Sequence, residues 1–93
     1  MITLEFKNNR EVIDFLRDNK KTLFKTLFVE IQESKKNGSD IAIGANLIVK
    51  DMVISVAVEK ENWLSHLTIS MDYFLQIEDY EMCANIRDLI DII

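Results

Sequence analysis

The chain has 93 residues and a formal net charge of −5, with 48% hydrophobic and 29% charged residues, the balance of one folded domain rather than a disordered tail. No apolar run reaches the roughly 18 residues that span a membrane, and the first residues lack the basic start and apolar stretch of a signal peptide. With one cysteine and no disulfide framework of its own, the protein is expected in the cytoplasm.

The first part of the sequence predicts a strand followed by a long helix. Residues 2–6 alternate apolar and polar, which is the period of a half-buried strand. Asn8 or Asn9 then caps a helix. Its apolar stripe is formed by Val12, Leu16, Leu23, Leu27 and Ile31. The polar run 18–20 interrupts the helix, but the stripe stays nearly in phase, so we expect one long or gently kinked helix ending at Gly38.

Residues 41–58 predict a β-hairpin that turns at or beside Lys50-Asp51, either as a two-residue tip or, since Lys-Asp is a mediocre tight turn, as a slightly longer loop. The two-residue tip fixes a register. This register collects apolar pairs on one face: Val49 with Met52, Leu47 with Ile54, Ala45 with Val56, and Ile43 with Val58. The opposite face pairs Asn46 with Ser55, Gly44 with Ala57, and Ala42 with Glu59. A shift of one residue would destroy this segregation. We therefore expect five core residues in the hairpin: Ile43, Leu47, Ile54, Val56 and Val58.

A lone hairpin is marginally stable, so we expect the N-terminal strand to join it in a small antiparallel sheet covered by the long helix. Trp63 should close one edge of that core, and two further helices follow, the last capped by Asp79. The sequence thus predicts an α+β fold of order β-α-β-β-α-α in a single domain, 1–93. Its α/β part is 1–60 and its C-terminal helical hairpin is 63–93.

The run from Ile77 to Ile90 carries the one recognisable signature. It contains Tyr80-Glu81, Ala84, Ile86-Arg87-Asp88 and Ile90, with Met71 nine residues before Tyr80 and Leu64 and Leu67 before that. These residues resemble the UVR motif, the helical hairpin shared by the UvrB and UvrC nucleotide-excision-repair proteins. Cys83 stands where that family prefers Ala, but both residues are small and readily buried.

The resemblance covers about a third of the chain and implies a docking surface that carries no chemistry. By family analogy the partner is a repair nuclease complex, an AAA+ protease or a second copy of the chain. The partner-binding residues that it implies are Met71, Tyr80, Glu81, Ile86, Arg87 and Ile90. The family's helicase and nuclease parts could not fit in 93 residues. The paired-Cys zinc sites of a third protein with this motif, the activator of a protein arginine kinase, cannot be built from one cysteine.

Residues for catalysis are sparse. His66 is the only histidine and is expected on a helix surface, while Cys83 is expected to be a buried, inert thiol. No glycine-rich phosphate loop, nucleophile motif or cysteine pair is present. We therefore expect a protein that is not an enzyme and has no catalytic residues, no metal and no cofactor.

The distribution of charged and apolar residues predicts which kinds of partner the chain binds. Residues 1–38 carry eight basic and six acidic side chains, and residues 39–93 carry three and ten. The acidic half argues against direct nucleic-acid binding. Residues 63–93 hold more apolar side chains than one buried face can hide, so we expect a protein partner, a homodimer, or both. The alternative function is a small acidic, phage-type effector that inhibits a host enzyme or mimics nucleic acid.

Overall fold

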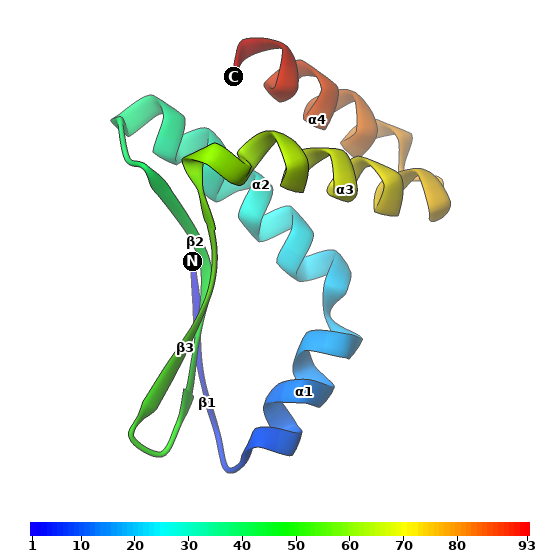
Figure 1. The fold of residues 1–93 in the computed structure, drawn as a ribbon. Helices are drawn as coiled ribbons and strands as arrows, with labels where there is room; N and C mark the ends of the chain where they lie inside the picture. The colour runs from blue at the N-terminus through cyan, green and yellow to red at the C-terminus, as the bar shows by residue number, and fades with distance from the viewer.

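The structure is a computed structural model that describes residues 1–93, and it builds helices onto one face of a three-stranded sheet (Figure 1). In chain order the elements are β1 (Ile2–Phe6), α1 (Asn9–Asp18), α2 (Lys20–Asn37), β2 (Ile41–Val49), β3 (Met52–Glu59), the 3-10 turn η1 (Lys60–Asn62), α3 (Trp63–Gln76) and α4 (Tyr80–Ile92). The expected α+β class and the C-terminal pair of helices are confirmed.

The sheet has the order β1-β2-β3, and it is mixed rather than antiparallel. β2 and β3 form the predicted antiparallel hairpin, but β1 runs parallel to β2, with Leu4 opposite Leu47. The expectation of an antiparallel N-terminal strand was therefore wrong. The reason is the connection: α1 and α2 carry the chain back to the starting edge, as in other β-helix-β crossovers, and such a return produces parallel strands.

The hairpin turns at Lys50-Asp51 as predicted, and its register holds from Val49 opposite Met52 to Ala45 opposite Val56. Beyond this point a β-bulge at Gly44 shifts the pairing, so that Ala42 rather than Ile43 lies opposite Val58. Ile43 is consequently not a core residue; Ala42 is buried in its place. The bulge also replaces the expected pairs on the other face by Ile43 with Ala57 and Ile41 with Glu59.

Gly44 lies at the bulge because α2 passes close to the sheet there. A Cβ atom added to Gly44 would lie 2.8 Å from two carbon atoms of the Leu27 side chain. The glycine thus allows a close approach of helix and strand, a common role of glycine within strands. Leu27 itself is buried.

The predicted long helix is two helices, α1 and α2, that meet at an angle at Asn19 (Figure 1). Asn19 leaves the helical conformation, with φ of −124° and ψ of 32°. Its side-chain amide donates to the Phe15 carbonyl at 2.9 Å and supports the end of α1. Asn8 caps α1 through a bond from the Glu11 amide, and Gly38 ends α2 with a φ of 73°, both as predicted.

The break separates two clusters of buried side chains. The smaller one joins α1 and the start of α2 to the sheet and contains Val12, Leu23, Ala45, Leu47 and Val49. The larger one joins α2, α3 and α4 and contains Phe28, Ile31, Ala42, Trp63, Leu67, Phe74, Ile86 and Leu89. The Trp63 indole donates to the Val58 carbonyl at 3.0 Å, which fixes α3 against the end of β3. The prediction that Trp63 closes an edge of the core is confirmed.

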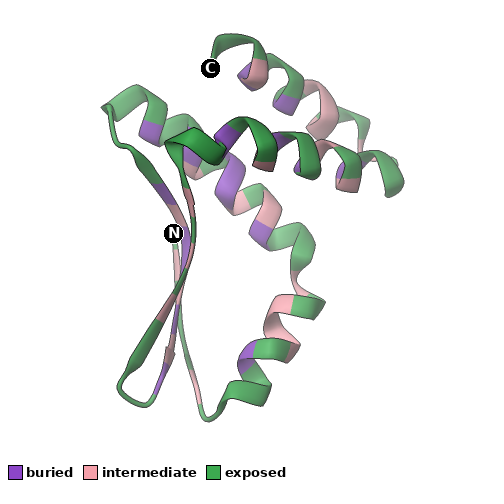
Figure 2. Cartoon of the chain, in the orientation of Figure 1, coloured by how far each residue is buried: buried purple, intermediate pink, exposed green.

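Of the remaining predicted core residues, Leu47 is fully buried, whereas Ile54, Val56 and Val58 are half-buried in β3 (Figure 2). They face the helices, but β3 is an edge strand and its outer side is uncovered. No helix of the fold has the length and apolar character required to cross a membrane.

Candidate interaction surface

The C-terminal hairpin is formed by α3 and α4, which are joined by only three residues, 77–79. Glu78 adopts the left-handed conformation, with φ of 60°, which reverses the chain within this short connection. The Asp79 carboxylate then accepts a hydrogen bond from the Met82 amide at 3.2 Å and caps α4, as its place in the sequence predicts. The connection therefore positions α4 beside α3.

One face of this hairpin is fixed to the rest of the domain. The buried residues of α3 are Trp63, Leu67, Ser70 and Phe74, and those of α4 are Ile86 and Leu89. Phe24 of α2 stacks against Tyr73, with ring centroids 4.9 Å apart, and meets the edge of the Phe74 ring at 6.3 Å. The spacing of these residues on α3 is that of a single helical stripe, so the opposite sides of both helices face away from the core.

The contact between Met71 and Cys83 shows how the two helices are aligned. The Cys83 thiol lies 3.8 Å from the Met71 carbonyl. Because the helices run in opposite directions, this alignment puts Leu64 level with Ile90 along the hairpin, and Leu75 level with the start of α4 at Tyr80. We call the resulting surface the outer face, and it consists of Leu64, Met71, Leu75, Tyr80, Cys83, Arg87 and Ile90.

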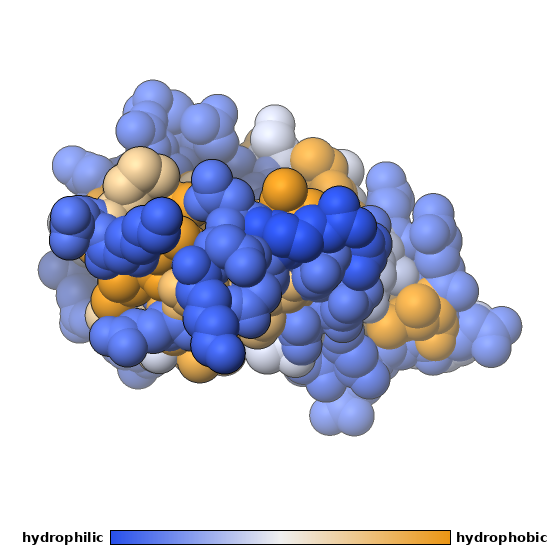
Figure 3. Space-filling view, turned by 90° about the horizontal axis from the view of Figure 1, so that it is seen from below, coloured by the Kyte–Doolittle hydropathy of each residue, from blue (hydrophilic) through white to orange (hydrophobic).

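The outer face exposes apolar surface. Leu64 is 53% exposed, Leu75 47% and Tyr80 63%, while Met71 and Ile90 are half-buried between the helices. Figure 3 shows an apolar patch surrounded by hydrophilic atoms at the right-hand end of the molecule, the end at which Figure 1 shows α3 joined to α4. Ile77, in the connection at this end, is also exposed. Clustered exposed apolar side chains of this kind are typical of interaction sites.

The structure places the six residues implied by the UVR resemblance in different environments. Met71 and Ile90 lie in the seam of the outer face, and Tyr80 projects from the first turn of α4. Glu81 and Arg87 are exposed, and Arg87 forms an ion pair with Asp88 at 3.1 Å. Ile86 has no exposed surface; it holds α4 on the core and cannot touch a partner while the domain is folded.

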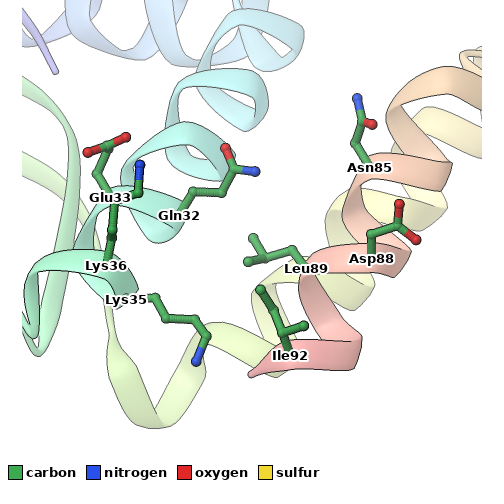
Figure 4. A pocket seen from close by; sticks show the side chains of 8 residues that line it. All are labelled: Gln32, Glu33, Lys35, Lys36, Asn85, Asp88, Leu89 and Ile92. Atoms are coloured by element: carbon green, nitrogen blue, oxygen red, sulfur yellow. The ribbon is translucent and has the colours of Figure 1, made fainter.

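A groove of about 620 Å³ lies between α2 and α4, on the other side of α4 from the outer face. Leu89 and Ile92 point from α4 towards α2, and Lys35 extends below them (Figure 4). The rim of the groove carries charges of both signs and two amides: Glu33, Lys36, Asp88, Gln32 and Asn85. The sequence did not indicate this groove, because its two walls are about fifty residues apart along the chain.

The two candidate reactive side chains, His66 and Cys83, lie in different environments and have different neighbours. His66 is partly buried, and not fully exposed on the helix surface: its ring packs on Phe24, with centroids 5.6 Å apart, and its Nε2 lies 3.3 Å from the Ser70 hydroxyl. Burial lowers the pKa of His66 below its ordinary value of 6.5. Cys83 is only half-buried, at the seam with α3. No three His, Cys, Asp or Glu side chains come together in a way that could hold a metal ion.

The environment of His66 predicts a loss of stability in mild acid. The unfolded chain binds the proton near pH 6.5 and the folded chain only at a lower pH, so the unfolded state holds more protons between these values. The stabilising effect is complete above about pH 6.5 and declines as the pH falls through the folded pKa. Urea unfolding of the parent and of His66→Gln at several pH values checks this. The free energy of unfolding of the parent should fall more between pH 6.5 and the folded pKa than that of the variant. Both proteins keep the same carboxylates, so the difference between the two curves is the contribution of His66. Parallel curves for the two proteins would contradict it.

Comparison of the chain with models of protein families, with curated proteins and with solved structures finds no match.

Proposed function

We propose that this protein is a non-enzymatic adaptor or regulator that docks on a larger protein through the outer face of its C-terminal hairpin. The observation that carries the proposal is the exposure of Leu64, Leu75 and Tyr80 on one side of two helices whose other side is anchored in the core. An anchored hairpin presents these side chains on rigid elements, which lowers the ordering cost of binding.

The composition of the outer face is suited to protein recognition. Tyr80 and Arg87 are of the types that most often dominate binding energy at interfaces. The exposed Arg87 lies three residues before Ile90 on α4, beside the apolar seam of Met71 and Ile90, and an apolar centre within a polar rim is the usual anatomy of a protein-protein interface. Arg87 is held beside Asp88 rather than buried, so it remains available to a carboxylate of the partner.

The UVR resemblance supplies the kind of partner for this proposal: a repair nuclease complex or an AAA+ protease, by analogy with the family. The pair of helices α3 and α4, joined by three residues, supports this analogy, because the motif is a helical hairpin. Ile86 then acts through folding alone, and Met71, Tyr80, Glu81, Arg87 and Ile90 remain as contact residues.

The test is affinity purification of the tagged protein from its native cell, with quantification of the co-purified proteins. Leu75→Asp and Tyr80→Ala change only exposed side chains of the outer face and should reduce recovery of the specific partner by about tenfold or more. Ile13→Asp is the matched control, because Ile13 is 56% exposed on α1, far along the chain from the hairpin. A partner that is lost equally with all three variants, or with none, would contradict docking through the outer face.

The acidic-effector alternative rests on three exposed carboxylates of α4: Glu81, Asp88 and Asp91. The same purification distinguishes it, because binding through charge weakens steeply as salt is raised, whereas binding through apolar contacts does not. Recovery that collapses at high salt and is unaffected by Leu75→Asp would favour the acidic effector.

A further inference from the structure

The outer edge of β3 is a second, separate surface with unsatisfied bonding capacity. β3 is the last strand of the sheet, and its eight residues pair only with β2 (Figure 1). The Lys60 amide donates to the Asp40 carbonyl at 2.8 Å. Because bonding alternates along an antiparallel strand, the residues in phase with Lys60, from Val58 back to Met52, bond to β2. Val53, Ser55, Ala57 and Glu59 direct their N–H and C=O groups outwards.

This edge lacks the features that normally keep edge strands apart. Natural sheets protect such edges with charged side chains, proline, bulges or very short strands. The only charge in β3 is that of Glu59, its last residue; residues 52–58 contain neither a charge nor a proline, and the bulge of the hairpin lies in β2 instead. The opposite edge strand, β1, is shorter, with five residues against eight. The row of free backbone groups on β3 specifies a strand as its occupant.

We propose that β3 pairs antiparallel with β3 of a second copy of this chain, which joins the two sheets across a two-fold axis at Val56. In this register Ile54 lies opposite Val58 of the second copy, and Val53 lies opposite Glu59 of the second copy. The half-buried side chains of Ile54, Val56 and Val58 all remain on the helix side of the joined sheet. Moving the two-fold axis towards the hairpin tip, to Ser55, would place Asp51 opposite Glu59, and like charges in such positions are destabilising.

A groove beside the edge matches this register. It has a volume of about 530 Å³ and lies between the end of β3 and α3, with Ala57, Val58, Glu59, Asn62, Ser65, His66 and Ile69 as its lining. Met52, 56% exposed, is in phase with Ile54 and therefore faces the helix side. In the joined sheet Met52 of the second copy lies opposite Lys60, next to this groove and to Ile69, which is 59% exposed. The two-fold axis repeats this contact, so each copy supplies both the side chain and the groove.

The pairing makes a charge-reversal test possible at Val53, which is 61% exposed and tolerates a polar replacement in the monomer. Val53→Glu places two carboxylates opposite each other at both ends of the seam. Val53→Lys, the matched control, removes the same apolar side chain but faces the Glu59 carboxylate. The double variant Val53→Glu with Glu59→Lys restores opposite charges in the reverse sense.

Sedimentation equilibrium of the full chain measures the outcome, with circular dichroism to verify folding. The parent and Val53→Lys should be dimers, Val53→Glu should raise the Kd of the dimer by about tenfold or more, and the double variant should recover it. Leu75→Asp, on the outer face, should leave the dimer intact, which separates this proposal from docking through the hairpin. A monomeric parent, a Val53→Glu dimer of unchanged Kd, a Val53→Lys monomer, or a dimer lost in Leu75→Asp overturns the pairing.

Discussion

Ile86→Asp is expected to prevent the domain from folding. Ile86 has no exposed surface and lies in the larger core cluster, among side chains such as Trp63 and Phe74. The side chains of that cluster are apolar and offer a buried carboxylate no hydrogen-bond donor except the Trp63 indole, which already donates to the Val58 carbonyl. Burying an unpaired charge is among the costliest single changes, about 4 kcal/mol or more. A domain of this size has a total stability of roughly 5–14 kcal/mol, so much or all of it would be lost.

The neighbouring position supplies the control. Asn85→Asp introduces the same side chain one residue earlier, where the residue is exposed on the rim of the groove between α2 and α4. It should change the free energy of unfolding by less than about 0.5 kcal/mol. Circular dichroism and urea unfolding of the two variants measure the difference. A folded Ile86→Asp protein would mean that α4 is not anchored as described, and the outer face would then need to be redefined.

Leu47→Ala is expected to lower the free energy of unfolding by about 2–5 kcal/mol, the range for a leucine deleted from a packed core. Leu47 is fully buried in the middle strand, with Leu4 on one side and Ile54 on the other. It is part of the smaller cluster with Val12 of α1 and Leu23 of α2. The cavity left by the truncation would be enclosed by both helices and the sheet, so little relaxation is available to offset its cost.

Ile54→Ala is the matched comparison, because Ile54 is the cross-strand partner of Leu47 but only half-buried on the edge strand. Its truncation should cost about 1–2 kcal/mol, since less apolar area returns to water and the site opens to solvent. Urea denaturation with fitted m-values measures both changes. Equal losses for the two variants would indicate that β3 is covered, and in a β3-paired dimer the loss at Ile54 should grow with protein concentration.

The sequence was sufficient for features governed by neighbours along the chain. The caps at Asn8 and Asp79 depend on a side chain and a backbone amide within one turn, and the cap at Gly38 depends on the left-handed backbone of that glycine. The hairpin tip followed from the alternation on both sides of Lys50-Asp51, because apolar segregation survives in only one register. The exposed apolar content of α3 and α4 was also visible, since one stripe on each helix cannot bury every apolar residue.

Tertiary structure decided whatever depended on contacts between distant segments. The direction of β1 followed from the return path through α1 and α2, and the bulge at Gly44 from the close approach of Leu27. The helix breaks at Asn19, and the bend there lets α1 and α2 cover separate core clusters. The apolar stripe stays in phase across the break, so the sequence pattern does not reveal it. Ile86 and Tyr80 match the same motif, yet one is buried and the other exposed, because packing against α2 and α3 selects which side of α4 is hidden. Local patterns determine which residues are able to be buried, and only the arrangement of the elements in space determines which of them are.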